Sequence, residues 1–267
     1  MKVTVAEGVG LNVLHTAGPS APAFVLVHGL ASNARLWSEV ASALAAAGHP
    51  SYAVDLRGHG ESDLPSSGFS TAAAAADLAA VIASLGLSRP IVAGQSWGGN
   101  VVVRLAAAFP GVVGALALVD GGWIDLPATF GSWSACAAAL RPPELDGLRA
   151  SDFRARLRSG HPDWSASAVE ATLANLRVDA DGLVSRRLPV ARHMEILRSM
   201  YDEPPAQWYP ALTMPVLLMP AGRGLPSPSV AASIPDAVVR PYAGGDHDLH
   251  AQHPAEVAAD LLSLVRS

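Results

Sequence analysis

A serine between glycines is the first feature of this sequence that could do chemistry. Residues 94–98 have glycine at both ends and Ser96 in the centre. They follow the apolar run 91–93, which is typical of a buried strand, and precede an apolar stretch typical of a helix. A tight strand-to-helix turn needs small residues two positions before and after the serine, and it projects the hydroxyl from the carboxyl edge of a sheet. The motif therefore predicts that Ser96 is a nucleophile.

A serine hydroxyl needs a general base, and His247 is the candidate. Histidine exchanges a proton near neutral pH, so it suits this role. His247 follows the last strand-like run of the chain, 238–242, which is where the base of such a site is expected. His250 and His253 continue at three-residue spacing, but the loop before the final helix and the base role of His247 argue against a metal site. We expect no metal and no cofactor.

The elements that would position these residues form an alternating pattern. Apolar runs occupy residues 24–27, 52–55, 91–93 and 112–119, and the alanine-rich stretches 36–47, 72–85 and 100–108 lie between them. Glycine or proline follows each stretch, as at the end of a helix. The alternation predicts strand–helix–strand units around a mostly parallel sheet, an α/β fold. Residues 3–5 and 11–14 predict an antiparallel hairpin at one edge of that sheet.

After residue 122 the sequence changes character. Residues 123–210 carry four of the six tryptophans and have the pattern of amphipathic helices interrupted by prolines. Strand-like runs return at 215–219 and 238–242, before a last helix over about 254–265. We therefore predict a core domain of residues 1–122 and 211–267, with an inserted all-helical domain of residues 123–210.

The composition excludes several classes of partner. The 267 residues carry a net charge of -5, without a lysine-rich or arginine-rich run that would bind nucleic acid or an anionic membrane. Cys136 is the only cysteine, so no intrachain disulfide can form, and it is expected to be a small buried apolar residue. No segment sustains the roughly 20 apolar residues of a membrane span. We expect a cytoplasmic protein with a small-molecule substrate, and the sequence does not indicate its oligomeric state.

These features together resemble the α/β-hydrolase family over nearly the whole chain. Besides the serine turn, His28 and Gly29 follow one predicted strand and residues 55–62 follow the next, in the order of that family's motifs. The resemblance implies a cofactor-free serine hydrolase. It also implies an oxyanion hole made by the backbone N–H groups of Leu30 and Trp97, and a helical cap, residues 123–210, over the site.

The acid that would orient His247 departs from the family's pattern. It usually follows the strand predicted at 215–219, but residues 219–226 contain no carboxylate. The resemblance allows the acid to lie at the end of the preceding strand, where Asp120 follows the apolar run 116–119. Asp246 and Asp248 are the alternatives, although we expect Asp248 to bond backbone amides at the entry of the last helices.

Four further residues are candidates for substrate contact. They are His28 in the oxyanion loop and Trp123, Arg192 and His193 in the insert, each with a structural role as the alternative. The favoured function is hydrolysis of an ester or lactone of a small, largely apolar substrate through an acyl-enzyme. The alternatives are carbon–carbon bond hydrolysis of a diketone-like substrate whose carboxylate Arg192 would bind, acyl transfer to an alcohol, and a ligand-binding homologue without turnover.

Overall fold

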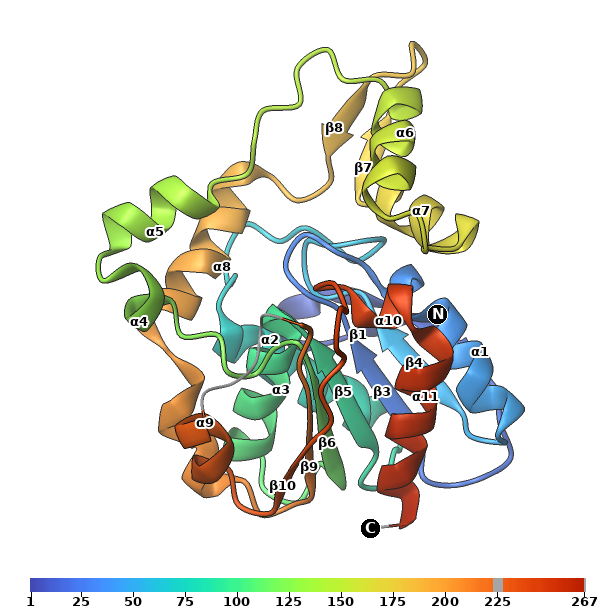
Figure 1. Cartoon of the computed structure of the whole chain (residues 1–267), viewed down its shortest axis with the longest axis vertical. Coiled ribbons are helices and arrows are strands. Elements are labelled where there is room, and N and C mark those ends of the chain that lie inside the picture. The colour runs from blue at the N-terminus through green and yellow to red at the C-terminus, as the bar shows by residue number, and fades with distance from the viewer. Residues whose placement is uncertain (223–227, 267) are drawn as a thin grey trace.

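A single sheet forms the centre of the structure, a computed structural model that describes residues 1–222 and 228–266 (Figure 1). In this part of the chain eight strands pair in the order β1-β2-β4-β3-β5-β6-β9-β10. The pairs of β2 with β1 and with β4 are antiparallel, and the remaining pairs are parallel. The predicted mostly parallel sheet with an antiparallel hairpin at one edge is therefore confirmed.

The predicted strands and helices of the core occur close to their expected positions. The strands are β1 (Lys2–Thr4), β2 (Gly10–Thr16), β3 (Phe24–Val27), β4 (Ser51–Val54), β5 (Ile91–Gln95), β6 (Ala115–Val119), β9 (Val216–Met219) and β10 (Ala237–Val239). The helices are α1 (Ser38–Ala46), α2 (Thr71–Ser84), α3 (Trp97–Ala108), α9 (Pro228–Ser233), α10 (Leu249–Gln252) and α11 (Pro254–Ser263), with short 3-10 turns at Ala6–Gly8, Ala34–Trp37 and Leu264–Arg266.

Both faces of the sheet are covered, which explains why its central strands are apolar throughout. In β3, Val25 and Val27 pack into the cluster that contains α2 and α3, whereas Phe24 and Leu26 pack into the cluster that contains α1 and α11. Figure 1 shows these two helix pairs on opposite sides of the strands. All four side chains are fully buried, and burial of each stabilises the fold by roughly 1.5–3 kcal/mol.

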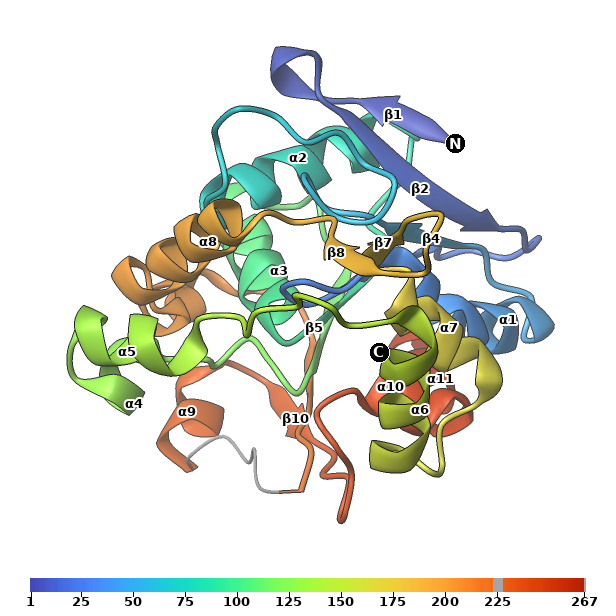
Figure 2. The same ribbon diagram turned by 90° about the horizontal axis from the view of Figure 1, so that it is seen from above.

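The insert between β6 and β9 lies largely above the sheet and contains one feature that the sequence analysis missed (Figures 1 and 2). Its elements are α4 (Leu126–Phe130), α5 (Trp133–Leu140), α6 (Ala150–Gly160), α7 (Ala166–Leu173), β7 (Leu176–Val178), β8 (Val184–Arg186), α8 (Val190–Asp202) and the 3-10 turn Pro205–Ala211. The antiparallel pair β7-β8 corrects the expectation of an all-helical insert. Each strand has three residues, of which only Leu176 and Val184 are buried, so neither produces an apolar run.

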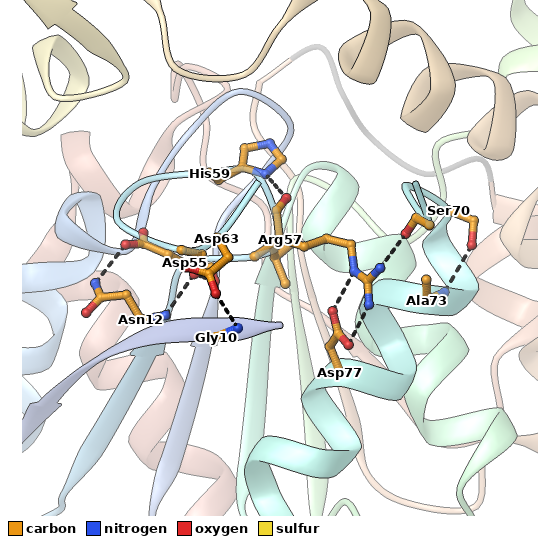
Figure 3. Close-up of polar contacts among 12 residues, drawn as sticks. Gly10, Asn12, Asp55, Arg57, His59, Asp63, Ser70, Ala73 and Asp77 are labelled. Carbon is orange, nitrogen blue, oxygen red and sulfur yellow. Dashed lines mark hydrogen bonds and ion pairs between the residues drawn. The ribbon is translucent and has the colours of Figure 1, made fainter. Parts of the chain in front are cut away.

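The turn after β4 is built around buried charges (Figure 3). The carboxylate of Asp55 accepts hydrogen bonds from the backbone N–H of Ala34 at 2.7 Å and of Glu61 at 3.0 Å. Arg57 makes a bidentate ion pair with Asp77 of α2, with both N···O distances at 2.7 Å. Because these charges are paired and hydrogen-bonded, they can be buried without the full cost of losing water.

The Arg57–Asp77 pair predicts a large loss of stability in Asp77→Ala. The two side chains are 6% and 2% exposed, so the substitution would leave a buried guanidinium without its partner. We expect the free energy of unfolding, measured in urea, to fall by about 3–5 kcal/mol. Asp202→Ala is the matched control, because Asp202 is 47% exposed in its pair with Arg198 and should change stability by less than about 1 kcal/mol. Equal losses in the two variants would contradict this view of the turn.

Candidate active site

Ser96 stands in a strained turn between β5 and α3. Its backbone has φ 53° and ψ -124°, a conformation that non-glycine residues rarely adopt. The turn is also crowded, because a Cβ atom at Gly98 would lie 2.5 Å from the carbonyl oxygen of His28, and one at Gly94 would lie 2.3 Å from that of Gly98. The two glycines of the motif are thus required by close backbone approach, and the turn leaves Ser96 lining a cavity.

Asp120 and His247 meet at the same edge of the sheet. The Asp120 Oδ2 atom lies 2.6 Å from His247 Nδ1, and Asp120 Oδ1 accepts a hydrogen bond of 2.9 Å from the backbone N–H of Ala221. Gln95, beside the serine, donates from its side-chain amide to the carbonyl oxygen of His247 at 2.9 Å. Asp120 directly follows β6, so its carboxylate reaches the imidazole from the end of the strand next to β5. In the loop 219–226, where this acid usually lies, residues 223–226 are outside the described part of the chain.

Negative charge surrounds the imidazole of His247. Burial lowers the pKa of this histidine, but the hydrogen bond to Asp120 and the charges of Asp248, Asp120 and Asp246 raise it, and the net direction is upward. The side chain nevertheless remains 54% exposed, so it is open to a ligand. With Nδ1 held by a carboxylate, Nε2 is the nitrogen left to exchange a proton.

Ser96 and His247 line one cavity of about 210 Å³. Leu30, Asn175 and Asp248 also line it. Trp97 contributes differently: its indole is buried and donates to Thr71 Oγ1 at 3.1 Å, while its backbone N–H lies in the first turn of α3, where helix geometry provides no carbonyl partner. The cavity therefore holds the predicted nucleophile and base together with one of the two residues expected to form the oxyanion hole.

His28 has a structural role, which corrects the expectation that it contacts the substrate. It is fully buried; its Nδ1 donates to the carbonyl oxygen of Gly29 at 2.7 Å, and its Nε2 accepts from the backbone N–H of Leu56 at 3.0 Å. His59 makes a similar bridge, because its Nε2 accepts from Ala31 N–H at 3.1 Å. Burial lowers the pKa of both rings, that of His59 to about 3. Two neutral histidines thus join the loop after β3 to the turn after β4.

Asp246 joins the insert to the histidine loop. Its Oδ2 atom lies 3.0 Å from Nδ1 of His161 and accepts a 3.0 Å hydrogen bond from the indole of Trp164, and the two rings are stacked. Its Oδ1 accepts from the backbone N–H of Asp248 at 2.8 Å. The expected capping role of Asp248 is wrong, because its side chain makes no such bond at α10 and lines the Ser96 cavity instead. Neither carboxylate takes the place of Asp120 at His247 Nδ1.

Comparisons with known proteins identify the family to which this fold belongs. A family model described as alpha/beta hydrolase fold matches residues 22–221. The chain belongs to the α/β-hydrolase fold family. It is 30% identical over 222 residues to the N-formylmaleamate deformylase of Pseudomonas putida, which covers 82% of this chain and 77% of that protein. The crystal structure of E-2-(acetamidomethylene)succinate hydrolase superposes with a TM-score of 0.83 at 22% identity, covering 100% of this chain and 98% of the other.

Other relatives of this α/β hydrolase match over a shorter segment. An esterase of Mycobacterium tuberculosis is 41% identical over 104 residues, which is 39% of this chain and 34% of that protein. The chain thus spans about a third of the length of the first curated relatives that it matches.

The substrate-contact residues expected in the insert have mixed outcomes. His193 lines a second cavity next to the Ser96 cavity. Arg192 instead pairs with Glu195 and lies over the ring of Phe69, at 5.4 Å from its centroid, which corrects its expected place beside the substrate. Trp123 is partly buried against the core. Cys136 is fully buried, as predicted.

Two arginines that the sequence analysis missed, Arg186 and Arg187, line the second cavity of this α/β hydrolase. Arg186 is the last residue of β8 and Arg187 begins the next loop, and this turn of the chain places both side chains at the cavity. The sequence has no motif that predicts this placement. The only signal was their adjacency, because no other two lysines or arginines are consecutive in the sequence.

The histidines near the chain end do not gather around a metal position. His250 is buried against Trp37, with a ring-centroid distance of 4.4 Å, and burial lowers its pKa to about 3. His253 instead pairs with Glu256 at 2.8 Å. Within residues 1–222 and 228–266 no three metal-binding side chains group together. Across the same residues, every helix is too short or too polar to span a membrane.

The carboxylates around His247 predict that its pKa is raised and that removal of one of them lowers it. An NMR titration of the imidazole signals should place the pKa of His247 above 6.5, and Asp248→Asn should lower it because one of the raising charges is removed. His250 is an internal control that should stay neutral over the same pH range. Asp202→Asn, which removes an exposed carboxylate from α8, should leave the curve in place. A pKa of His247 that does not move in Asp248→Asn would contradict this account.

Proposed function

We propose that this chain is a cofactor-free serine hydrolase that cleaves an ester or lactone of a small substrate through an acyl-enzyme. The observation that carries the proposal is Ser96, held at a positive φ in the same cavity as a histidine that is bound to a carboxylate. The positive φ of Ser96 costs conformational free energy, and backbone strain of this kind is typical of functional sites.

In the proposed mechanism Ser96 Oγ attacks the carbonyl carbon while His247 Nε2 takes its proton. Asp120 keeps the proton of the imidazole on Nδ1 and stabilises the imidazolium. The N–H groups of Leu30 and Trp97 would donate to the oxyanion of the tetrahedral intermediate. His247 then gives its proton to the leaving oxygen, and water, activated by the same histidine, releases the acyl group as the acid and restores Ser96.

Other observations support hydrolysis over the alternatives. Relatives named as an esterase and as a deformylase favour the release of an acyl group. Arg192, which was expected to bind a substrate carboxylate, is engaged with Glu195, so this residue no longer favours the carbon–carbon alternative. The paired Asp120 and His247 weigh against a receptor without turnover, since binding alone does not need them. A cytoplasmic location is part of the proposal, and the single cysteine supports it.

Labelling with a fluorophosphonate tests the nucleophile without knowledge of the substrate. Intact-mass analysis should show one adduct on the wild type and none on Ser96→Ala or His247→Ala, because the reagent needs an activated serine. Ser42→Ala is the control: this exposed hydroxyl bonds only to the carbonyl of Ser38, so the adduct should persist. An adduct on Ser96→Ala would overturn the assignment of the nucleophile.

The role of Asp120 predicts a severe kinetic defect in Asp120→Asn. The amide can still occupy the site, but it favours the wrong tautomer of His247, and we expect kcat for an ester to fall on the order of 10⁴-fold. Asp248→Asn should change kcat far less, because Asp248 does not hold His247 Nδ1. The proposed triad is wrong if the two variants exchange these outcomes.

A further inference from the structure

A second cavity adjoins the one that contains Ser96. Its volume is about 40 Å³, room for about three water-sized groups. Ala31, Ser32 and Asn175 line both cavities, so a ligand at Ser96 can extend into the second one. The far wall is built by Arg186, Arg187 and His193 of the insert. The core domain therefore contributes the serine, and the insert contributes a cationic wall.

The two guanidinium groups have hydrogen-bonding capacity left over. Arg187 lies 3.2 Å from a carboxylate oxygen of Glu61 and bonds the carbonyl of Gly60 at 3.4 Å, but its buried Nε atom has no partner in the structure. Arg186 donates to the carbonyl oxygen of Pro143. Each group carries five N–H donors, and the contacts named here engage two nitrogens of Arg187 and one of Arg186.

The cavity wall itself carries only positive charge. Its lining, all from the described part of the chain, includes the two arginines and no acidic residue. His59 and His193 do not add to the charge, because burial lowers the pKa of both, aided for His193 by the nearby charge of Arg186. Burial also lowers the pKa of Arg186, opposed by Glu144, but a guanidinium stays protonated in proteins. Glu61, outside this lining, pairs with Arg187, and an anion in the cavity would neutralise the positive charge that remains.

The opposite end of the combined cavity is negative. Asp248 lines it directly, and Asp120 and Asp246 lie beside His247. A ligand with one anionic group would thus be repelled from the histidine end and attracted to the arginine end. This polarity would fix its orientation and leave its neutral carbonyl at Ser96.

We propose that Arg186 and Arg187 form a carboxylate-binding site, and that the substrate is a small half-ester or half-amide of a dicarboxylic acid. A planar carboxylate can accept two parallel N–H bonds, which suits the forked donors of the two arginines that line the cavity. The identity of the reacting bond rests on the proposed function, whereas carboxylate binding does not.

Binding of monomethyl glutarate, which carries one carboxylate, can be measured by calorimetry on Ser96→Ala and tests the site without turnover. Adding Arg187→Gln or Arg186→Gln should weaken binding roughly 10- to 100-fold, as expected for the loss of charge-assisted hydrogen bonds. Arg187→Lys, which keeps the charge and loses the fork, should give an intermediate loss. Arg177→Gln is the matched control, because Arg177 lies on the same hairpin but is exposed. Arg177 follows Leu176, the residue that pairs with Arg186, so its side chain points to the other face of the hairpin. Undetectable binding of monomethyl glutarate, or binding unchanged in both glutamine variants, would overturn the site.

Turnover separates the failure of this site from the failure of the proposed function. Proton release from monomethyl glutarate and from methyl pentanoate compares a carboxylate with a methyl group on chains of equal length. The wild type should prefer the half-ester, and Arg187→Gln should lower kcat/KM roughly 10- to 100-fold for it alone. Equal losses for both esters would make the arginines structural and overturn the site. Binding of monomethyl glutarate without hydrolysis of either ester would keep the site and overturn the hydrolase.

Discussion

Backbone strain at the ends of three adjacent strands is the constraint on which the candidate site depends. Ala31 after β3, Ser96 after β5 and Asp120 after β6 have φ values of 59°, 53° and 42°. Each non-glycine residue in this region costs on the order of 1–2 kcal/mol. Hydrogen bonds hold two of these residues in place. The backbone N–H of Ala31 donates to His59, and the backbone N–H of Ala221 donates to the carboxylate of Asp120. These backbone conformations turn the chain sharply at each strand end. The hydroxyl of Ser96, the carboxylate of Asp120 and the loop that contains Ala31 therefore lie at the same edge of the sheet.

The insert completes this site from the other side, and charge determines how it is attached. Asp246 makes polar contacts with two insert side chains next to His247, and Glu61 of the β4 turn pairs with Arg187. The same contacts divide the combined cavity into a negative half at the histidine and a positive half at the arginines. The same ionic groups therefore contribute to fold stability and to the proposed orientation of the substrate. A substitution of one of these groups would affect both properties.

Sequence reasoning worked where a local pattern has one physical cause. The apolar runs predicted the central strands because a sheet covered on both faces excludes polar residues. It failed where burial is sparse: the hairpin β7-β8 has one buried residue in each strand. It also expected Arg192 at the cavity, where Arg187 lies instead. Arg192 and Arg187 are both cationic residues of the insert, and only the path of the chain between β8 and α8 turns one toward Glu195 and the other toward the cavity.

The sequence by itself determined the α/β order of elements, the serine turn and the histidine after the last strand, because each depends on residues close together in the chain. Only the tertiary structure decided which carboxylate reaches His247. Asp246 and Asp248 adjoin it in sequence, yet Asp120, 127 residues away, makes the 2.6 Å contact. The reason is geometric. Parallel strands bring distant residues to one edge, whereas the neighbours of a loop histidine point toward the insert and the cavity instead.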